Sequence, residues 1–426
     1  MTNYPKIWRP YTQHQTMGDL TQIESASGAI LRTSDGREIV DLISSWWVNV
    51  HGHAHPVIAE AIGAQAKRLE QVIFAGFTHE PAEQLANGLL AVMGAPFEHL
   101  FLSDNGSTSV EVAIKMALQF AANTGHPERN KIIAFDGGFH GDTWAAMAAG
   151  RKSGFFEAYA RFLPLDVIHL DFAATFEGDP DQAANEARTL ESLKQVISKS
   201  GSEIAGLIIE PLIQGASGMR MCSASWLNQV VSLAQDAGIK VIFDEVMTGF
   251  GRTGRMFAFE HLEARPDLVC LSKGITGGFM PLAATATTRE IFAAFLDSSY
   301  SSALSHGHSF SGNPLACSAA VASLGLFEEE QTLARIAAQT EIHQERMPRL
   351  ANTQQHRFCG AIAACELKGP DGYASQQSVE LRNRFLAADI LIRPLGNTLY
   401  LFPPACLAPE ELHKAYDKIE PVLAAI

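Results

Sequence analysis

Short, mostly apolar runs alternate with stretches of helical periodicity through the middle of the chain, and this alternation constrains the fold more than any other feature. Each run is bounded by Asp, Gly or Pro, as expected of a strand that is buried on both faces. Between the runs, residues 110–120 and 226–234 carry apolar side chains at helical spacing. This order predicts an α/β fold with a mostly parallel sheet and helices on both of its faces. The predicted strands, seven in all, are residues 100–103, 131–135, 167–170, 204–209, 239–243, 267–271 and 282–287.

Three shorter pieces flank this core. The chain starts with a hairpin-like segment that turns at Asp35–Gly36, continues after the core with a charged helical stretch at 327–349, and ends in an α/β segment from about residue 359. We therefore expect a large domain over residues 50–315 and a smaller domain formed by both chain ends, residues 1–49 and 316–426.

Composition and charge narrow the class of protein. Of the 426 residues, 47% are hydrophobic and 18% are charged, which is typical of a globular chain and not of a disordered one. The formal net charge of −14 argues against nucleic acid or an anionic membrane as a partner. The six cysteines are scattered, which favours reduced thiols in a cytoplasm. We also expect neither export nor a membrane span, since the start lacks a signal-peptide pattern and long apolar windows are missing.

Polar residues follow two of the predicted strands, where an open parallel sheet places its chemistry. Asp244 and Glu245 end one strand, and Lys273 follows the next. Taken alone, such a pair is more often a salt bridge or two solvated loop residues. Residues 105–109 also lead from a strand into a helix, whose first amides could hold a phosphate or could simply be capped. Together these features indicate a pyridoxal phosphate site, in which a lysine forms a Schiff base and a carboxylate pairs with the pyridine nitrogen.

With these residues in place, the sequence resembles the class III, fold-type I aminotransferases over nearly its whole length. The matching motifs are DNGS at 104–107, FHGDT at 139–143, Glu210–Pro211 with Gln214–Gly215, Asp244–Glu245, TGFGRTG at 248–254, SKG at 272–274 and SFSGNP at 309–314. Within the class, the sequence is most similar to the branch that aminates 8-amino-7-oxononanoate with S-adenosylmethionine in biotin formation. The marks of that branch are WRPYTQ at 8–13, SSWW at 44–47, and IRPLG at 392–396 followed by Tyr400.

The resemblance implies a role for each matching residue. Lys273 would form the Schiff base and move the proton in a ping-pong cycle, and Asp244 would pair with the pyridinium nitrogen. Gly106 and Ser107 would bind the cofactor phosphate. Ser309 would serve the site of the other subunit, so that a homodimer is implied by the resemblance.

Two residues depart from the pattern of this branch. Phe139 would stack on the cofactor ring, but the branch usually has tyrosine there, and His308 stands where proline is expected. The loss of a hydroxyl keeps the stacking and removes one polar contact. Phe139 therefore leaves open a second hypothesis, a class III ω-aminotransferase that acts on another amine or ω-amino acid with a keto-acid acceptor.

The substrate pocket follows from the resemblance as well. Arg393 would bind the terminal carboxylate of the keto substrate, and aromatic side chains suit both its aliphatic chain and a sulfonium cation. Because adjacent strand residues point to opposite faces, we expect at most one of the two tryptophans to face the ligand. The implied substrate residues are Tyr11, Trp46, Trp47, Gly307, Arg393 and Tyr400.

Histidine runs raise a rival from a different class. His51, His53 and His55 alternate along the chain, and His306 and His308 add two more imidazoles, so that a metal-dependent hydrolase is an alternative, as is a noncatalytic protein of the same fold. Neighbouring Gly and Pro indicate a loop at the first run, which favours structural histidines and no metal.

Overall fold

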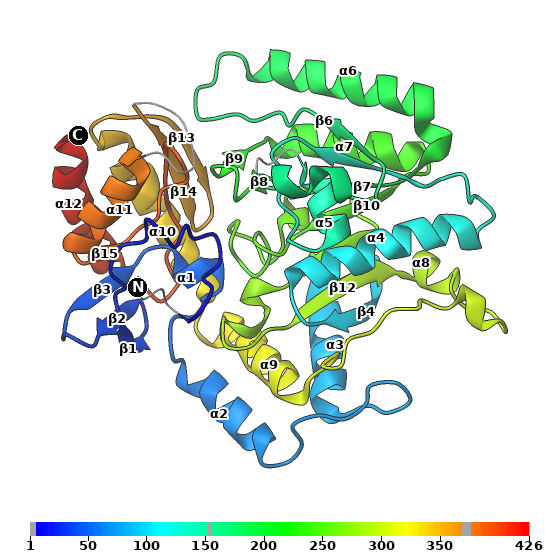
Figure 1. Cartoon of the computed structure of the whole chain (residues 1–426), viewed down its shortest axis with the longest axis horizontal. Coiled ribbons are helices and arrows are strands. Elements are labelled where there is room, and N and C mark those ends of the chain that lie inside the picture. Colours follow the sequence, from blue (N-terminus) through cyan, green and yellow to red (C-terminus); the bar gives the residue numbers. More distant parts are fainter. Residues whose placement is uncertain (1–5, 152–154, 369–375, 426) are drawn as a thin grey trace.

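The seven predicted runs all form strands of one sheet in the computed structural model, which describes residues 6–151, 155–368 and 376–425 (Figure 1). The strands lie in the order β4–β12–β11–β10–β7–β5–β6, and within this sheet only β12 runs antiparallel to its neighbours. The predicted α/β fold with a mostly parallel sheet is confirmed. The strand bounds are β4 Phe97–Ser103, β5 Lys131–Phe135, β6 Val167–Leu170, β7 Ile204–Ile209, β10 Lys240–Asp244, β11 Leu268–Leu271 and β12 Ala283–Thr288.

Both faces of this sheet are buried, which explains why its strands are apolar at nearly every position. Ile133 and Phe243 belong to a core that also contains residues of α3 and α7. Ile132 and Ile242, their neighbours in sequence, belong to a second core shared with α4 and α5. Alternate side chains of one strand thus point into two cores, because successive residues of a strand face opposite ways. The helices involved are α3 Glu80–Met93, α4 Gly106–Asn123, α5 Trp144–Ala149 and α7 Ala224–Asp236.

Further helices pack around the large sheet and next to the segments formed by the two chain ends. Helix α9 packs against α2 and α3. Among the described residues, no helix is long and apolar enough to cross a membrane. The remaining bounds are α2 Pro56–Ala66, α6 Gln182–Ser200, α8 Arg289–Ala293, α9 Pro314–Glu329 and α10 Thr332–Arg346, with a short hairpin of β8 Ile213–Gln214 and β9 Arg220–Met221.

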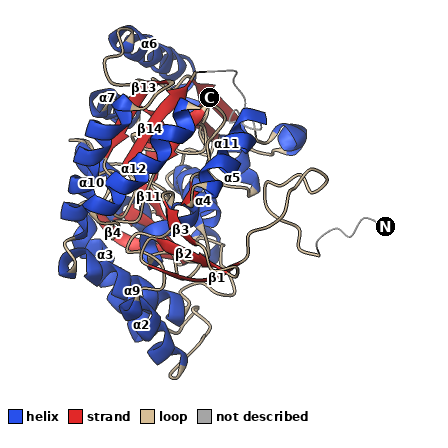
Figure 2. Cartoon of the chain, turned by 90° about the vertical axis from the view of Figure 1, so that its left-hand side faces the viewer, coloured by secondary structure: helices blue, strands red, loops and turns tan. Residues whose placement is uncertain are grey.

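The two chain ends pack around a separate core, with blue and red segments side by side in Figure 1. Strand β15, near the C-terminus, pairs with β3 of the N-terminal hairpin, which turns at Asp35–Gly36 as predicted. Figure 2 shows α10 and α12 in front of β13 and β14. The domain boundaries at residues 50 and 315 stay a prediction. The bounds are β1 Ile23–Ser27, β2 Ile30–Thr33, β3 Glu38–Asp41, β13 Thr353–Cys359, β14 Ile362–Leu367, β15 Ile390–Leu391, β16 Thr398–Leu401, α11 Gln376–Ala387 and α12 Pro409–Ala424.

The segment that carries the paired tryptophans is not a strand, and our expectation there is wrong. Residues Ser44–Trp47 form the short helical turn α1, and Ser44, Ser45 and Trp47 have positive φ angles of 50°, 59° and 67°. The alternation of side chains that holds for a strand does not apply to such a backbone. Trp46 and Trp47 consequently line the same cavity.

Candidate active site

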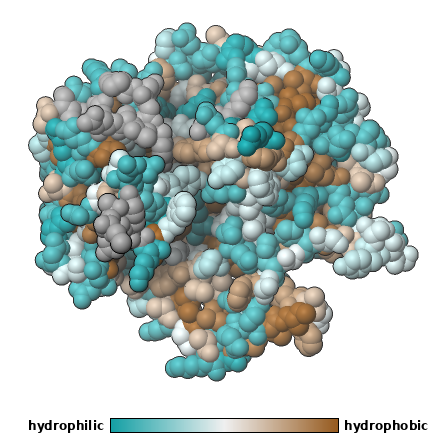
Figure 3. All heavy atoms as spheres, in the orientation of Figure 1, coloured by the Kyte–Doolittle hydropathy of each residue, from teal (hydrophilic) through white to brown (hydrophobic). Residues whose placement is uncertain are grey.

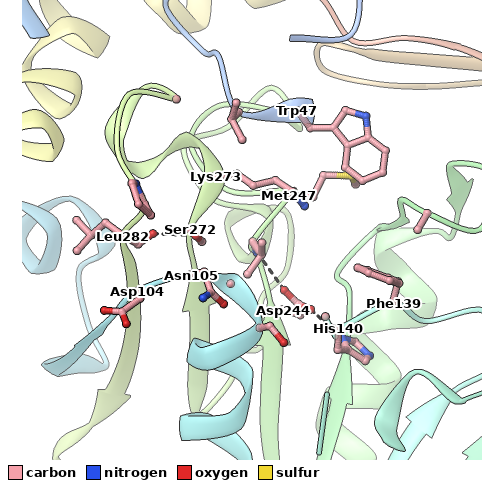
Figure 4. Close-up of a pocket in the computed structure, with 18 of the residues that line it drawn as sticks. Trp47, Asp104, Asn105, Phe139, His140, Asp244, Met247, Ser272, Lys273 and Leu282 are labelled. Carbon is pink, nitrogen blue, oxygen red and sulfur yellow. Dashed lines mark hydrogen bonds and ion pairs between the residues drawn. The ribbon is translucent and has the colours of Figure 1, made fainter. Parts of the chain in front are cut away.

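A cavity of about 420 Å³, here called the inner cavity, lies at the carboxyl ends of β10 and β11. Asp244 is the last residue of β10, and Lys273 follows β11 by two positions. Because β10 and β11 are parallel neighbours, both side chains reach the same edge of the sheet. Figure 4 shows both of them among the residues that line this cavity, with Phe139 and His140 on the adjacent wall.

Lys273 stands on a strained turn. Its φ angle is 34°, a left-handed value that non-glycine residues adopt at a cost of about 1–2 kcal/mol and often at functional sites. Its Nζ lies 4.9 Å from the centroid of the Trp47 ring. Burial lowers the pKa of Lys273, although the nearby carboxylates of Asp244 and Glu210 act in the opposite direction. The amine is therefore easier to deprotonate than a lysine in water.

Asp244 is buried and held from two sides. His140 Nδ1 lies 2.7 Å from Asp244 Oδ2, and the amide of Val246 donates to Oδ1 at 3.1 Å. Burial alone would lower the pKa of His140, but the hydrogen bond to Asp244 and the charges of Asp244 and Glu210 raise it. These contacts fix the Asp244 carboxylate at the floor of the cavity.

Glu210 is a second buried carboxyl group on this wall. It accepts hydrogen bonds from the amides of Phe139 at 2.9 Å and Gly215 at 3.0 Å. Burial raises the pKa of Glu210 to about 7. Its bond to the Phe139 amide fixes the backbone that presents the phenyl ring to the cavity.

The amino end of α4 forms a further wall of the inner cavity. Asn105 caps this helix and accepts from the amide of Thr108, so that the Gly106 and Ser107 amides come first in the helix and have no partner within it. Ser107 Oγ lies 2.7 Å from Thr143 Oγ1 and accepts from the Thr143 amide at 3.0 Å. Free amides and the positive end of a helix dipole make this wall suitable for an anion.

A larger cavity of about 790 Å³, here called the aromatic cavity, continues from the inner one. Lys273, Trp47 and Phe139 line both cavities. The hydroxyl of Tyr400 accepts from Trp47 Nε1 at 3.1 Å. Arg393 lies at the wall of this cavity with its Cζ 5.4 Å from the centroid of the Trp46 ring. The amine of Lys273 and the guanidinium of Arg393, which lies against the Trp46 indole, thus face the same aromatic cavity.

A model of the family described as "Aminotransferase class-III" matches residues 11–423. The chain belongs to this family. The adenosylmethionine-8-amino-7-oxononanoate aminotransferase of Synechococcus elongatus is 44% identical over 100% of both chains. The enzyme of the same name from Geobacter sulfurreducens is 37% identical over 97% of this chain and 94% of its own.

Solved structures agree with this family assignment. An adenosylmethionine-8-amino-7-oxononanoate aminotransferase from Methanocaldococcus jannaschii superimposes with a TM-score of 0.91 at 31% identity, covering 99% of this chain and 97% of the other. An amine transaminase from an uncultivated Pseudomonas species, in its pyridoxal-phosphate-bound form, gives a TM-score of 0.92 at 28% identity over 99% of both chains.

Class III aminotransferases use pyridoxal 5'-phosphate, and the inner cavity of this family member fits that cofactor. Its walls bring together an amine at Lys273, a carboxylate at Asp244 and an anion-binding helix end. At Gly141 an added Cβ would lie 2.3 Å from Ser107 Oγ. Only glycine therefore allows this loop to pack so closely against the helix end that would hold the phosphate.

The structure places most of the predicted residues around these two cavities. Gly307 and Ser309 are not among the described residues that line the inner or the aromatic cavity. The Ser309 carbonyl instead accepts a hydrogen bond from Gln71 Nε2 at 2.9 Å. The predicted residues that line one or both cavities are Tyr11, Trp46, Trp47, Gly106, Ser107, Phe139, Asp244, Lys273, Arg393 and Tyr400.

Sequence reasoning assigned no role to three side chains that the structure brings into the site. His140 lies in the FHGDT motif beside Phe139, and Glu210 lies in the Glu210–Pro211 motif. Membership of these motifs was the sequence signal that could have pointed to both residues. Asp142 also lies in such a motif and accepts from the hydroxyl of Tyr11 at 2.6 Å. The contacts of these side chains with Asp244, Phe139 and Tyr11 each join segments that are distant in sequence.

The three histidines of the first run have different surroundings, whereas His306 Nε2 and His308 Nε2 of the second run lie 3.0 Å from each other. His53 Nε2 lies 2.8 Å from Asp41, and His55 Nε2 lies 2.9 Å from Glu330. His51 is buried, and burial lowers its pKa to about 4. Over the part of the chain that the structure describes, no three His, Cys, Asp or Glu side chains are arranged to hold a metal ion.

Proposed function

We propose that this chain transfers an amino group from S-adenosylmethionine to 8-amino-7-oxononanoate, the reaction that its relatives are named for and a step of biotin formation. One observation carries the proposal in this structure. The amine of Lys273 lies where a polar, anion-binding cavity meets an aromatic cavity that has a guanidinium on its wall. A phosphorylated cofactor suits the first space, and a long keto acid suits the second.

The residues of the inner cavity divide the work of transamination. Pyridoxal phosphate, when bound, supplies an electron sink for the pair released when a substrate Cα–H bond breaks. Lys273 would hold the cofactor, and its amine would accept the Cα proton and return it to another carbon. Asp244 would keep the ring nitrogen protonated, since a buried carboxylate favours a cation beside it. Ser107 and the amides of α4 would bind the phosphate, and Phe139 would cover the ring.

The aromatic cavity would bind both substrates in turn. Arg393 offers two parallel N–H donors to the distal carboxylate of 8-amino-7-oxononanoate. Trp46 and Tyr11, whose ring centroids lie 6.2 Å apart, provide flat apolar surfaces for its aliphatic chain. The same faces would attract the sulfonium of the donor.

We also propose that the site is completed in a homodimer. Ile73, Phe77 and Phe310 are 65%, 63% and 61% exposed. Phe310 follows Ser309 in sequence, and Ile73 and Phe77 follow Gln71, whose Nε2 donates to the Ser309 carbonyl. Figure 3 shows hydrophobic side chains on the loop that follows α2. Covering such a patch with a second copy would remove apolar surface from water and bring Ser309 toward the partner's cofactor. The six free cysteines support the proposal of a cytoplasmic location.

Transaminase assays with Lys273→Ala test the proposal. This variant should lose turnover and the visible absorbance of the loaded protein, whereas Lys199→Ala, at an exposed lysine of α6, should retain both. Turnover that survives in Lys273→Ala would contradict the role of Lys273.

A donor panel separates the second candidate, an ω-aminotransferase for another amine, which Phe139 in place of tyrosine favours. Wild-type protein is given 8-amino-7-oxononanoate with S-adenosylmethionine or with simple ω-amines, and 7,8-diaminononanoate is measured. Product with S-adenosylmethionine supports the proposal. No product with that donor, beside good turnover of an ω-amine, would favour the second candidate.

A further inference from the structure

A third cavity of about 710 Å³, here called the outer cavity, adjoins the aromatic one. The N-terminal segment at residues 9–21 forms one wall, and α11 with Arg393 forms the other. Ser378, Arg382 and Leu386 of α11 follow one another at four-residue spacing and all line this space, so that one face of the helix is turned toward it. Arg382 stands in the centre of this face.

The charge of the outer cavity is opposite to that of the whole protein. Of the described residues, three arginines line it, Arg9, Arg382 and Arg393, against a single acidic residue, Asp19, in a chain whose formal net charge is −14. Among the described residues, Arg9 Nε is buried without a hydrogen-bond partner. Such a local excess of guanidinium groups attracts small anions that the overall field repels.

Arg382 and Arg393 mark the junction between the outer and aromatic cavities, because both side chains line both spaces. Within the described part of the chain, neither guanidinium has a carboxylate at ion-pair distance. By contrast, Arg384, which lies on the same helix as Arg382, forms an ion pair with Glu380. Two cations that face the same cavity without a counterion repel each other, and a carboxylate bound between them relieves that repulsion.

We propose that Arg382 is a second carboxylate-binding residue, which shares the distal carboxylate of the acceptor with Arg393 at the junction of the outer and aromatic cavities. The inference rests on the proposed function, since it assigns a part of the same acceptor's binding. It commits to a medium-chain carboxylate as the ligand. S-adenosylmethionine carries its carboxylate close to the reacting amine, so its binding should not depend on Arg382.

Steady-state kinetics of the holoenzyme test this role with Arg382→Gln, Arg382→Lys and the control Arg384→Gln. For Arg382→Gln we expect KM for 8-amino-7-oxononanoate to rise about tenfold, the effect of one hydrogen bond to a charged group near the surface. Values of kcat and of KM for S-adenosylmethionine should stay within about twofold, since Arg382, unlike Lys273, does not line the inner cavity. Arg382→Lys should restore part of the loss, and Arg384→Gln should match wild type.

The methyl ester of the acceptor gives the discriminating readout. The ester lacks the negative charge, so Arg382→Gln should leave its kcat/KM unchanged, whereas a merely structural role would lower kcat/KM for acid and ester alike. An unchanged KM for the acid, or equal losses for acid and ester, would overturn the inference.

Nonanoate binding separates this inference from the proposed function. If wild-type protein forms no 7,8-diaminononanoate, the proposed function fails, but calorimetry with nonanoate still tests Arg382. We expect its Kd to rise about tenfold in Arg382→Gln. Equal nonanoate affinity in wild type and Arg382→Gln would overturn the role of Arg382 whatever the reaction is.

Discussion

Replacing Gly141 by alanine tests whether the helix end of α4 is shaped by close packing of the neighbouring loop. Gly141 has a φ angle of 118°, and an added Cβ would lie 2.3 Å from Ser107 Oγ and 2.7 Å from Ser107 Cα. Because the second of these atoms is backbone, a rotation of the serine side chain cannot relieve the contact. Ser107 must move, together with its hydrogen bonds to Thr143.

Two contributions to the expected loss of folding stability in Gly141→Ala can be separated by a matched control variant. A left-handed backbone strains any alanine by about 1–3 kcal/mol, and overpacking adds about 1–3 kcal/mol. Gly125, at the other end of α4, has a φ angle of 89° and nothing within 4 Å of an added Cβ. Gly125→Ala should therefore show the strain alone, and Gly141→Ala should lose about 1–3 kcal/mol more in the free energy of unfolding.

Cofactor binding gives the second readout. Displacing Ser107 should remove the hydrogen bond that we propose it makes to the phosphate, worth about 1.5–3 kcal/mol, so that pyridoxal phosphate binds at least about tenfold more weakly to Gly141→Ala. Urea denaturation measures the stability, and titration of the apoprotein followed by visible absorbance measures the affinity. The reasoning is refuted if both alanine variants lose the same stability and both bind the cofactor as wild type does.

Three further predictions concern buried groups of the site and the core. His140→Phe removes a hydrogen bond from the buried carboxylate of Asp244 and should lower the free energy of unfolding by about 3 kcal/mol in urea denaturation, and a loss below about 1 kcal/mol would contradict the pairing. Because burial lowers the pKa of Lys273 from its ordinary value of 10.5, and only the unprotonated amine reacts, the loading rate of the apoprotein should reach half its maximum below pH 10.5; a midpoint at or above that pH would contradict this. Burial raises the pKa of all six free thiols, Cys222, Cys270, Cys317, Cys359, Cys365 and Cys406. The native protein should therefore react slowly with a disulfide reagent at pH 8, and the unfolded protein should react rapidly. Fast labelling of the native protein would count against a closed core.

Local patterns were enough to predict the seven strands of the large sheet and the polar residues Asp244 and Lys273 that follow two of them. Strand β7, Ile204–Ile209, is buried at all positions, and such a run is readable from hydrophobicity alone. The turn at Ser44–Trp47 was not readable, since its left-handed backbone depends on distant contacts, among them the bond from Ser44 Oγ to the Phe402 carbonyl. Patterns of period two or 3.6 carry no information on such a turn.

The cationic junction of the outer cavity was missed for a similar reason. In the sequence, Arg382 is one of two arginines on a helix with a polar composition, and it is 11 positions from Arg393. Its place beside Arg393 depends on how α11 packs against β15 and on the N-terminal segment that covers both.

The sequence by itself determined the class of the fold and showed which polar residues follow its strands, because strand and helix periodicities and the residues that end them are local properties. Tertiary structure decided which of these groups meet. The parallel register of β10 and β11, with Asp244 opposite Cys270, brings Asp244 and Lys273 to one cavity. The pairing of β15 with β3 brings Arg393 within reach of Trp46. Such pairings depend on the burial of whole surfaces between distant segments, which no local pattern specifies.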